Sequence, residues 1–385
     1  MNEQQALAAP GNRIFWLDNL RTFAVFLVVL LHAGLVYESS GLTAFFWIVD
    51  DPATNDLSGI VNLVLDIFVM SAIFFVAGFF TPPSLARKTP WAFLRSKFKR
   101  LYVPWIIAVL TLIPLYKVIF LYSRGLPQEH WTTYFHWTNG IWNQNWLWFL
   151  PVLFLFDVLY VLLSRINIDV SSMTVGSAVG ATFALGFLYT LSIDLLGLQG
   201  WTKTFLFDFQ NERIFIYFMI FLVGALCYRL RTFETAPTNK RLYVVLSCTV
   251  WIPICLYLLL VIYPLIQPGA HLFSVTLDRL LFHFSFMVSL LSLLYLTIST
   301  FRYYLNGQGT LSRELSRNSY SVYIIHTVVL GGIALVLMSV AIPSLMKHVS
   351  LAVLTYSVSS LLVYVYRRAT SPMLSSVPAI KYDNA

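Results

Sequence analysis

The sequence predicts an all-α polytopic membrane protein with about ten transmembrane helices and both termini in the cytoplasm. Of its 385 residues, 58% are hydrophobic and 11% are charged, whereas soluble domains carry about 25% charged residues. A membrane-spanning helix needs about 20 apolar residues, and apolar runs of that length recur along the whole chain. The composition therefore excludes an ordinary soluble protein.

Ten apolar runs are long enough to be helices that cross a bilayer. In chain order, the predicted spans are 14–38, 57–80, 101–123, 145–164, 172–195, 212–230, 242–265, 277–300, 319–340 and 349–366. The longest intervening loops, near 39–56, 81–100, 124–144 and 301–318, are too short for a folded domain. We therefore expect residues 1–385 to form a single integral membrane domain.

Basic residues are distributed very unevenly between the two sides of these spans. With a cytoplasmic N-terminus, the outer segments hold only Arg124, Lys203 and Lys347. The inner segments hold eighteen basic residues, which are Arg13, Arg87, Lys88, Arg95, Lys97, Lys99, Arg100, Arg165, Arg229, Arg231, Lys240, Arg241, Arg302, Arg313, Arg317, Arg367, Arg368 and Lys381. This asymmetry follows the positive-inside rule. It accounts for the net charge of +8 without a nucleic-acid partner.

Ionisable residues inside a membrane are costly and are functional candidates by default. The first span carries Asp18, Arg21 and His32. Asp18 and Arg21 are three residues apart and share a helix face. Arg21 and His32 are eleven residues apart, which places them on one face about 16 Å apart along the axis. An anionic donor held by Arg21 could thus bring its reactive end to His32. A structural alternative also stays open, in which Arg21 extends to the interface and His32 bonds a backbone carbonyl.

Two further intramembrane residues are candidates for supporting roles. Asp66 falls in the outer half of the second span, where it could orient His32, although a buried carboxylate bonded to a backbone donor is the alternative. His326 in the ninth span lies, by residue counting, near the depth of Arg21. We expect it either to help hold the donor or to be a structural histidine. Arg213 and Arg279, at outer helix ends, are expected to be interfacial.

Five segments, taken in order, resemble acyltransferase family 3, whose members move acyl groups from acyl-coenzyme A to glycans and lipids. Arg21 and His32 fit the Arg/Lys-x10-His motif of that family, preceded by a similar lead-in at 17–20. The other segments are 70–78, 97–105, 146–150 and 319–326. The segment 70–78 departs from the family pattern, because Ser71 stands where the family has proline and Ala77 where it has serine. In 97–105, Lys97 and Arg100 occupy the two basic positions of an Arg-x-x-Arg motif. Within the family, the chain looks most similar to the glucan biosynthesis protein C group, which implies succinylation of periplasmic glucans.

The resemblance implies an O-acyltransferase of the bacterial inner membrane. It would move an acetyl or succinyl group from cytoplasmic acyl-coenzyme A to a hydroxyl of an extracytoplasmic glycan or lipid-linked acceptor. His32 would be a general base or a nucleophile that carries the acyl group. Arg21, Lys97 and Arg100 would bind the donor phosphates. Acyl-coenzyme A is the donor substrate, and no bound cofactor or metal is expected. The oligomeric state stays open, and membrane lipids surround the chain.

Tryptophans gather in the outer segment from 131 to 148. We expect Trp137 and Trp142 to contact the sugar acceptor, and Trp146 and Trp148 to belong to the interfacial aromatic belt. A secondary transporter is the rival class, because a few buried charges within ten spans also describe transporters. The sequence shows no paired halves of the kind that transporters often carry.

Overall fold

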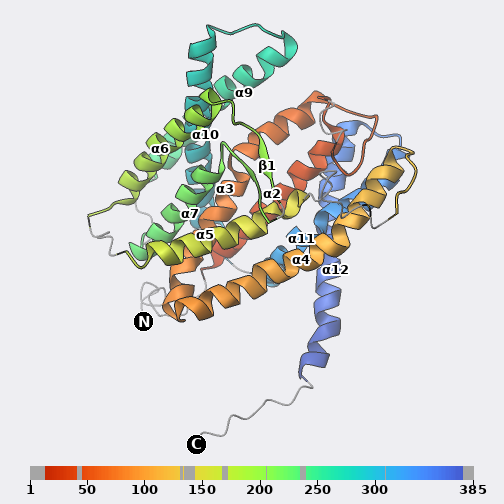
Figure 1. The fold of residues 1–385 in the computed structure, drawn as a ribbon, viewed down its shortest axis with the longest axis horizontal. Coiled ribbons are helices and arrows are strands. Elements are labelled where there is room, and N and C mark those ends of the chain that lie inside the picture. The colour runs from red at the N-terminus through yellow and green to blue at the C-terminus, as the bar shows by residue number, and fades with distance from the viewer. Residues whose placement is uncertain are drawn as a thin grey trace, which may run out of the picture.

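The computed structural model describes residues 14–40, 46–130, 133, 144–166, 172–204, 206–234, 240–307 and 309–375. Figure 1 shows a bundle of long helices with one short hairpin between them. The helices are α2 (Phe15–Tyr37), α3 (Asp56–Ala86), α4 (Pro90–Ser123), η3 (Asn145–Trp148), α5 (Phe149–Leu163), α6 (Val175–Leu195), α7 (Ile214–Arg229), α8 (Arg241–Thr249), α9 (Trp251–Ile266), α10 (Val275–Tyr304), α11 (Thr310–Met338) and α12 (Ser344–Ser375). The strands are β1 (Trp201–Lys203) and β2 (Asp208–Gln210).

The helices confirm the predicted class. Among the described residues, nine helical segments are long and apolar enough to cross a membrane, with η3 and α5 counted together and α8 and α9 counted together. The shorter apolar helix α7 corresponds to the predicted span 212–230. We call the side on which α2 begins the cytoplasmic side, as the distribution of basic residues predicts.

Helix α7 compensates for its shortness by very close packing against α3. A Cβ atom at Gly78 would lie 2.0 Å from the carbonyl oxygen of Phe221, and one at Gly224 would lie 2.2 Å from that of Phe75. Glycines at both contact points therefore let the two backbones touch, as small residues do between membrane helices. This contact holds α7 in the centre of the bundle.

Two segments that we predicted as cytoplasmic loops, 81–100 and 301–318, are largely helical. Helix α3 extends to Ala86, and α4 begins at Pro90, where the Thr89 side chain accepts a hydrogen bond from the backbone N–H of Ala92. A capping threonine followed by proline starts a helix efficiently, and charged residues are tolerated on a helix outside the bilayer. The hydropathy criterion detected only the apolar parts of these helices.

The outer connection between α2 and α3 folds back into the bundle. Trp47, Ile48 and Val49 are 2% exposed or less, although they belong to the predicted outer loop 39–56. The Tyr116 hydroxyl donates to the carbonyl of Phe46, and Arg124 Nη2 donates to the carbonyl of Trp47 at 3.1 Å. The connection thus forms part of the core next to the outer half of α2.

The hairpin lies on the outer side between α6 and α7. Its strands pair antiparallel, with Trp201 opposite Gln210 and Lys203 opposite Asp208. The buried Asp208 carboxylate accepts hydrogen bonds from the backbone N–H groups of Gln144, at 3.0 Å, and Thr204, at 3.1 Å. These bonds tie the hairpin to the segment that leads into α5.

Candidate active site

Helices α2 and α11 lie in contact, and two pairs of side chains show that they run in the same direction, from the cytoplasmic side outward. Near their cytoplasmic ends, Arg21 Nη2 donates to the Ser316 carbonyl at 3.1 Å and contacts its hydroxyl at 3.2 Å. Farther out, His32 Nδ1 lies 2.7 Å from His326 Nε2. The two contacts are eleven residues apart on α2 and ten apart on α11. The predicted common face of Arg21 and His32 is therefore the face that meets α11.

The two imidazole rings meet edge to edge in one plane. Their planes differ by 3°, and their centroids are 5.0 Å apart, which with a nitrogen–nitrogen distance of 2.7 Å excludes face-to-face stacking. This in-plane approach is the geometry of a direct hydrogen bond.

The backbone fixes which nitrogen of each ring carries a hydrogen. His326 Nδ1 lies 2.7 Å from the Tyr323 carbonyl oxygen, and because a carbonyl can only accept, this nitrogen is the donor. In a neutral His326 ring, Nε2 is then an acceptor, and it receives the Nδ1–H of His32. Thr327 Oγ1 lies 3.1 Å from the same nitrogen. His32 is left with an unprotonated Nε2, to which no other described residue makes a hydrogen bond. That nitrogen is placed to accept a proton or attack a carbonyl.

Aromatic side chains enclose this histidine pair. The Trp47 ring lies 4.9 Å from that of His32, and the Trp47 indole N–H donates to the His32 carbonyl at 3.0 Å. Tyr116 stacks on Trp146 at 5.7 Å, and the Trp146 indole donates to the Ile324 carbonyl at 2.9 Å. Trp47 thus lies against the His32 ring, and Tyr323, with its ring centroid 5.8 Å from that of His326, lies against the other imidazole. Sequence analysis missed Trp47, although the apolar run 45–49 within an outer loop was a detectable signal.

Our placement of Asp66 and His326 was wrong. Asp66 pairs with Arg213, with Oδ2 2.8 Å from Nη2, and the Asp66 carbonyl accepts from Nη1 at 2.7 Å. Arg213 directly precedes α7 and is 8% exposed, whereas the side chain of its partner Asp66 is 41% exposed. His326 lies beside His32 rather than at the depth of Arg21. Residue counting assumed that the ninth span begins near 319, whereas α11 begins at Thr310.

The cytoplasmic end of the same face is held by polar contacts. Arg21 pairs with Asp18, with Nη2 3.2 Å from Oδ1, and its side chain is 30% exposed. Asn19 Nδ2 donates to the carbonyls of Leu305 and Gly307 at 2.8 and 2.9 Å. The predicted Asp18–Arg21 pair is therefore present. It holds a partly exposed guanidinium against α11.

Lys97 and Arg100 on α4 have different surroundings. Lys97 Nζ lies 3.0 Å from Oδ1 of Asp157, a fully buried residue of α5 that also accepts from the Thr81 hydroxyl at 3.0 Å. Asp157 balances the charge of Lys97, and sequence analysis missed it. Arg100 is exposed, with its guanidinium 6.0 Å from the centroid of the Tyr320 ring on α11. Arg100 therefore flanks the same helix as Arg21.

The outer tryptophans divide into two groups. Trp137 and Trp142, our expected acceptor contacts, lie outside the described residues. Trp146 is 2% exposed, so assigning it to an interfacial belt was wrong. Trp148 packs against Trp201 of the hairpin at 5.5 Å and Tyr217 at 6.0 Å. Trp201 is 44% exposed.

Together, these contacts define the candidate site. The His32 imidazole lies in the outer half of α2, and the Arg21 guanidinium lies three turns below it on the same face. The family model described as an acyltransferase domain matches residues 14–364, and the chain therefore belongs to this family, acyltransferase family 3. No curated protein and no solved structure matches the chain. The family assigns an acyltransferase activity and disfavours the transporter interpretation.

Proposed function

We propose that the protein transfers an acyl group across the membrane, from cytoplasmic acyl-coenzyme A to a hydroxyl group of an extracytoplasmic glycan or lipid-linked acceptor. The single observation that carries the proposal is the common α2–α11 face. On this face, the Arg21 guanidinium lies near the cytoplasmic end and the His32 imidazole lies eleven residues farther out, which supports a donor held at the first and acyl transfer at the second. Membership of the acyltransferase family supplies the reaction class.

The donor side of this proposal rests on Arg21 and Arg100. Both lie beside α11 near its cytoplasmic end, and guanidinium groups bind phosphates through paired N–H donors. Lys97 contributes less net charge, because it is paired with Asp157. We propose that Lys97 fixes the position of α4 and thereby of Arg100.

The chemical step uses His32 Nε2 as a general base. This nitrogen takes the proton of the acceptor hydroxyl while the hydroxyl oxygen attacks the thioester carbonyl carbon. A carbon–oxygen bond forms, the carbon–sulfur bond breaks, and the imidazolium returns the proton to the departing thiolate. The nucleophilic alternative uses the same nitrogen and forms an acyl-histidine, which then passes the acyl group to the hydroxyl. An acyl-enzyme trapped with labelled donor in the absence of acceptor would identify the second route.

The narrower assignments are also proposals. Resemblance to the glucan biosynthesis protein C group favours a succinyl donor, a periplasmic glucan acceptor and a bacterial inner-membrane location. The exposed Trp201 ring beside Trp148 supports a sugar acceptor, because tryptophan offers a large amphipathic face on the outer side.

The direct test is turnover of acetyl- and succinyl-coenzyme A by the purified protein in nanodiscs. His32→Ala should abolish thiol release and label transfer, whereas His271→Ala, at an exposed outer position, should leave both unchanged. Arg21→Gln should raise the donor KM by about 10- to 100-fold, the loss expected when a hydrogen bond to a charged group is removed. Arg279→Gln, at the outer end of α10, is the matched control. Full activity of His32→Ala would refute the site.

A further inference from the structure

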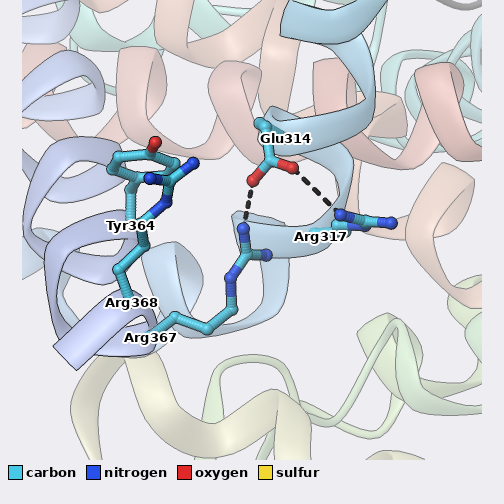
Figure 2. Close-up of a pocket in the computed structure, with 5 residues that line it drawn as sticks. All are labelled: Glu314, Arg317, Tyr364, Arg367 and Arg368. Atoms are coloured by element: carbon cyan, nitrogen blue, oxygen red, sulfur yellow. Dashed lines mark hydrogen bonds and ion pairs between the residues drawn. The ribbon is translucent and has the colours of Figure 1, made fainter. Parts of the chain in front are cut away.

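A basic pocket opens on the cytoplasmic side between α11 and α12. Its volume is about 410 Å³, and Glu314, Arg317, Tyr364, Arg367 and Arg368 line it. Figure 2 shows Glu314 between Arg317 and Arg367, with Tyr364 and Arg368 projecting from α12 on the other side. Three arginines and one glutamate give these side chains a net charge of +2.

Local contacts hold these cations in place. Glu314 Oε1 accepts from Arg317 Nη1 at 3.0 Å, and Glu314 Oε2 pairs with Arg367. The Arg368 guanidinium lies 5.1 Å from the centroid of the Tyr364 ring. The Arg317 and Arg367 side chains are 51% and 37% exposed. Because a guanidinium has five N–H donors, the contacts with Glu314 leave donors available to an anion.

The pocket borders the surface that faces lipid. Leu361, Leu362 and Val365, within two turns of Arg367 on α12, are 59%, 49% and 56% exposed. Helix α12 has 32 residues, a length of about 48 Å, whereas the hydrocarbon core is about 30 Å thick. Figure 1 shows the end of α12 extending past the neighbouring helices. Arg367 and Arg368 thus follow directly on a hydrocarbon-facing stretch, at the depth of phospholipid headgroups.

We propose that this pocket binds the phosphate of an anionic phospholipid from the cytoplasmic leaflet. The arginines supply paired donors and net positive charge, and the leucines next to them supply the surface for the acyl chains. Glu314 is ion-paired with Arg317 and Arg367 and offsets one of the three positive charges. A free phosphate would use the cations but would gain nothing from the apolar surface of α12. Arg317 of this pocket is next in sequence to Ser316, which holds Arg21, but the test below measures lipid binding in the absence of acyl donor, so its outcome can be distinguished from that of the acyl-transfer assay.

The test measures lipid binding to the full chain in neutral detergent by titration with phosphatidylglycerol and with phosphatidylcholine of the same acyl chains. We expect tighter binding of phosphatidylglycerol. The double variant Arg367→Gln/Arg368→Gln should lose about 30-fold in that affinity, since each basic residue near an anionic membrane surface contributes about fivefold. The double variant Arg165→Gln/Arg231→Gln removes the same charge from other exposed cytoplasmic positions and should lose little.

Glu314→Gln provides a second variant, which retains all three arginines and removes the competing carboxylate. It should bind phosphatidylglycerol at least as tightly as the native chain. Three results would overturn the proposal. These are unchanged lipid preference in the Arg367/Arg368 variant, equal losses in the control variant, or displacement of the lipid by equimolar inorganic phosphate or coenzyme A. The last result would identify a soluble phosphate ligand instead.

Discussion

Replacement of His326 by alanine tests whether this residue positions His32. His326 Nε2 accepts the hydrogen of His32 Nδ1 at 2.7 Å, and alanine would leave that buried donor without its acceptor. An unsatisfied buried donor costs about 1–3 kcal/mol, which corresponds to about 5- to 150-fold in kcat. His32 could then also adopt the other tautomer, with the hydrogen on Nε2, and lose its role as a base. We therefore expect kcat to fall by up to about 150-fold while the donor KM stays unchanged.

The assay is coenzyme A release by protein in nanodiscs, with donor and acceptor concentrations varied independently. His326→Gln is the conservative variant, because its amide oxygen can accept from His32 Nδ1 and should restore part of kcat. The double variant His32→Ala/His326→Ala should be no less active than His32→Ala alone, since residues that act as a unit are not additive. Monodisperse elution and unchanged thermal unfolding would show that each variant is folded.

Two results would refute this reasoning. If His326→Ala raised the donor KM and left kcat intact, His326 would bind the donor, as its position in the sequence first suggested. If His326→Gln lowered kcat as much as His326→Ala in a folded protein, then the loss of activity would not come from the missing hydrogen-bond acceptor at this position.

Three further predictions concern stability, each measured by thermal unfolding in nanodiscs. Gly78→Ala should lower the Tm, because the alanine Cβ would lie 2.0 Å from a backbone oxygen of α7. Gly180→Ala, where a Cβ would meet no atom within 4 Å, should leave the Tm unchanged. Equal effects of the two substitutions would contradict the packing argument. Burial raises the pKa of Asp208 to about 6. The Asp208 carboxyl therefore binds a proton more tightly in the folded chain than in the unfolded chain. Protonation of Asp208 stabilises the folded state at low pH, and this stabilisation is lost as the pH rises through about 6. The Tm of the native protein should therefore rise relative to that of Asp208→Asn between pH 7 and pH 5, and a constant difference would contradict this. Thr355→Val should leave the Tm unchanged or raise it, because the buried Thr355 hydroxyl has no partner among the described residues. Thr81→Val should lower the Tm, because it removes a hydrogen bond to the buried Asp157 carboxylate. The reverse order of the two effects would be inconsistent with these contacts.

The sequence predicted those parts of the site that depend on a single helix. Helix α2 is continuous from Phe15 to Tyr37, so the eleven-residue spacing of Arg21 and His32 translated directly into a common face. The Asp18–Arg21 pair followed from the same periodicity. The number of helices was predictable because each apolar run had to satisfy its own backbone hydrogen bonds within the membrane.

Contacts between helices were not predictable in the same way. Asp66 and His326 were each assigned a depth by counting from an expected helix start, and neither count contained information about the neighbouring helix. Asp66 pairs with Arg213 because the short α7 places that arginine below the outer surface. Asp157 is buried on all sides in an otherwise apolar helix and carried no motif. Its partner Lys97 was expected to face the donor.

The parallel packing of α2 and α11 limits how the acyl group can move. Ser316 and His326 hold Arg21 and His32 against the same neighbouring helix, so the separation of about 16 Å between them is set by two helices rather than by a loop. A donor anchored through its phosphates near Arg21 can then reach His32 only with an extended arm. The flexible part of the donor, and not a movement of α2, would cover this distance of about 16 Å. His326 would then fix the position of His32 relative to the end of that arm, because its Nδ1 bonds to the backbone of α11 and its Nε2 bonds to His32.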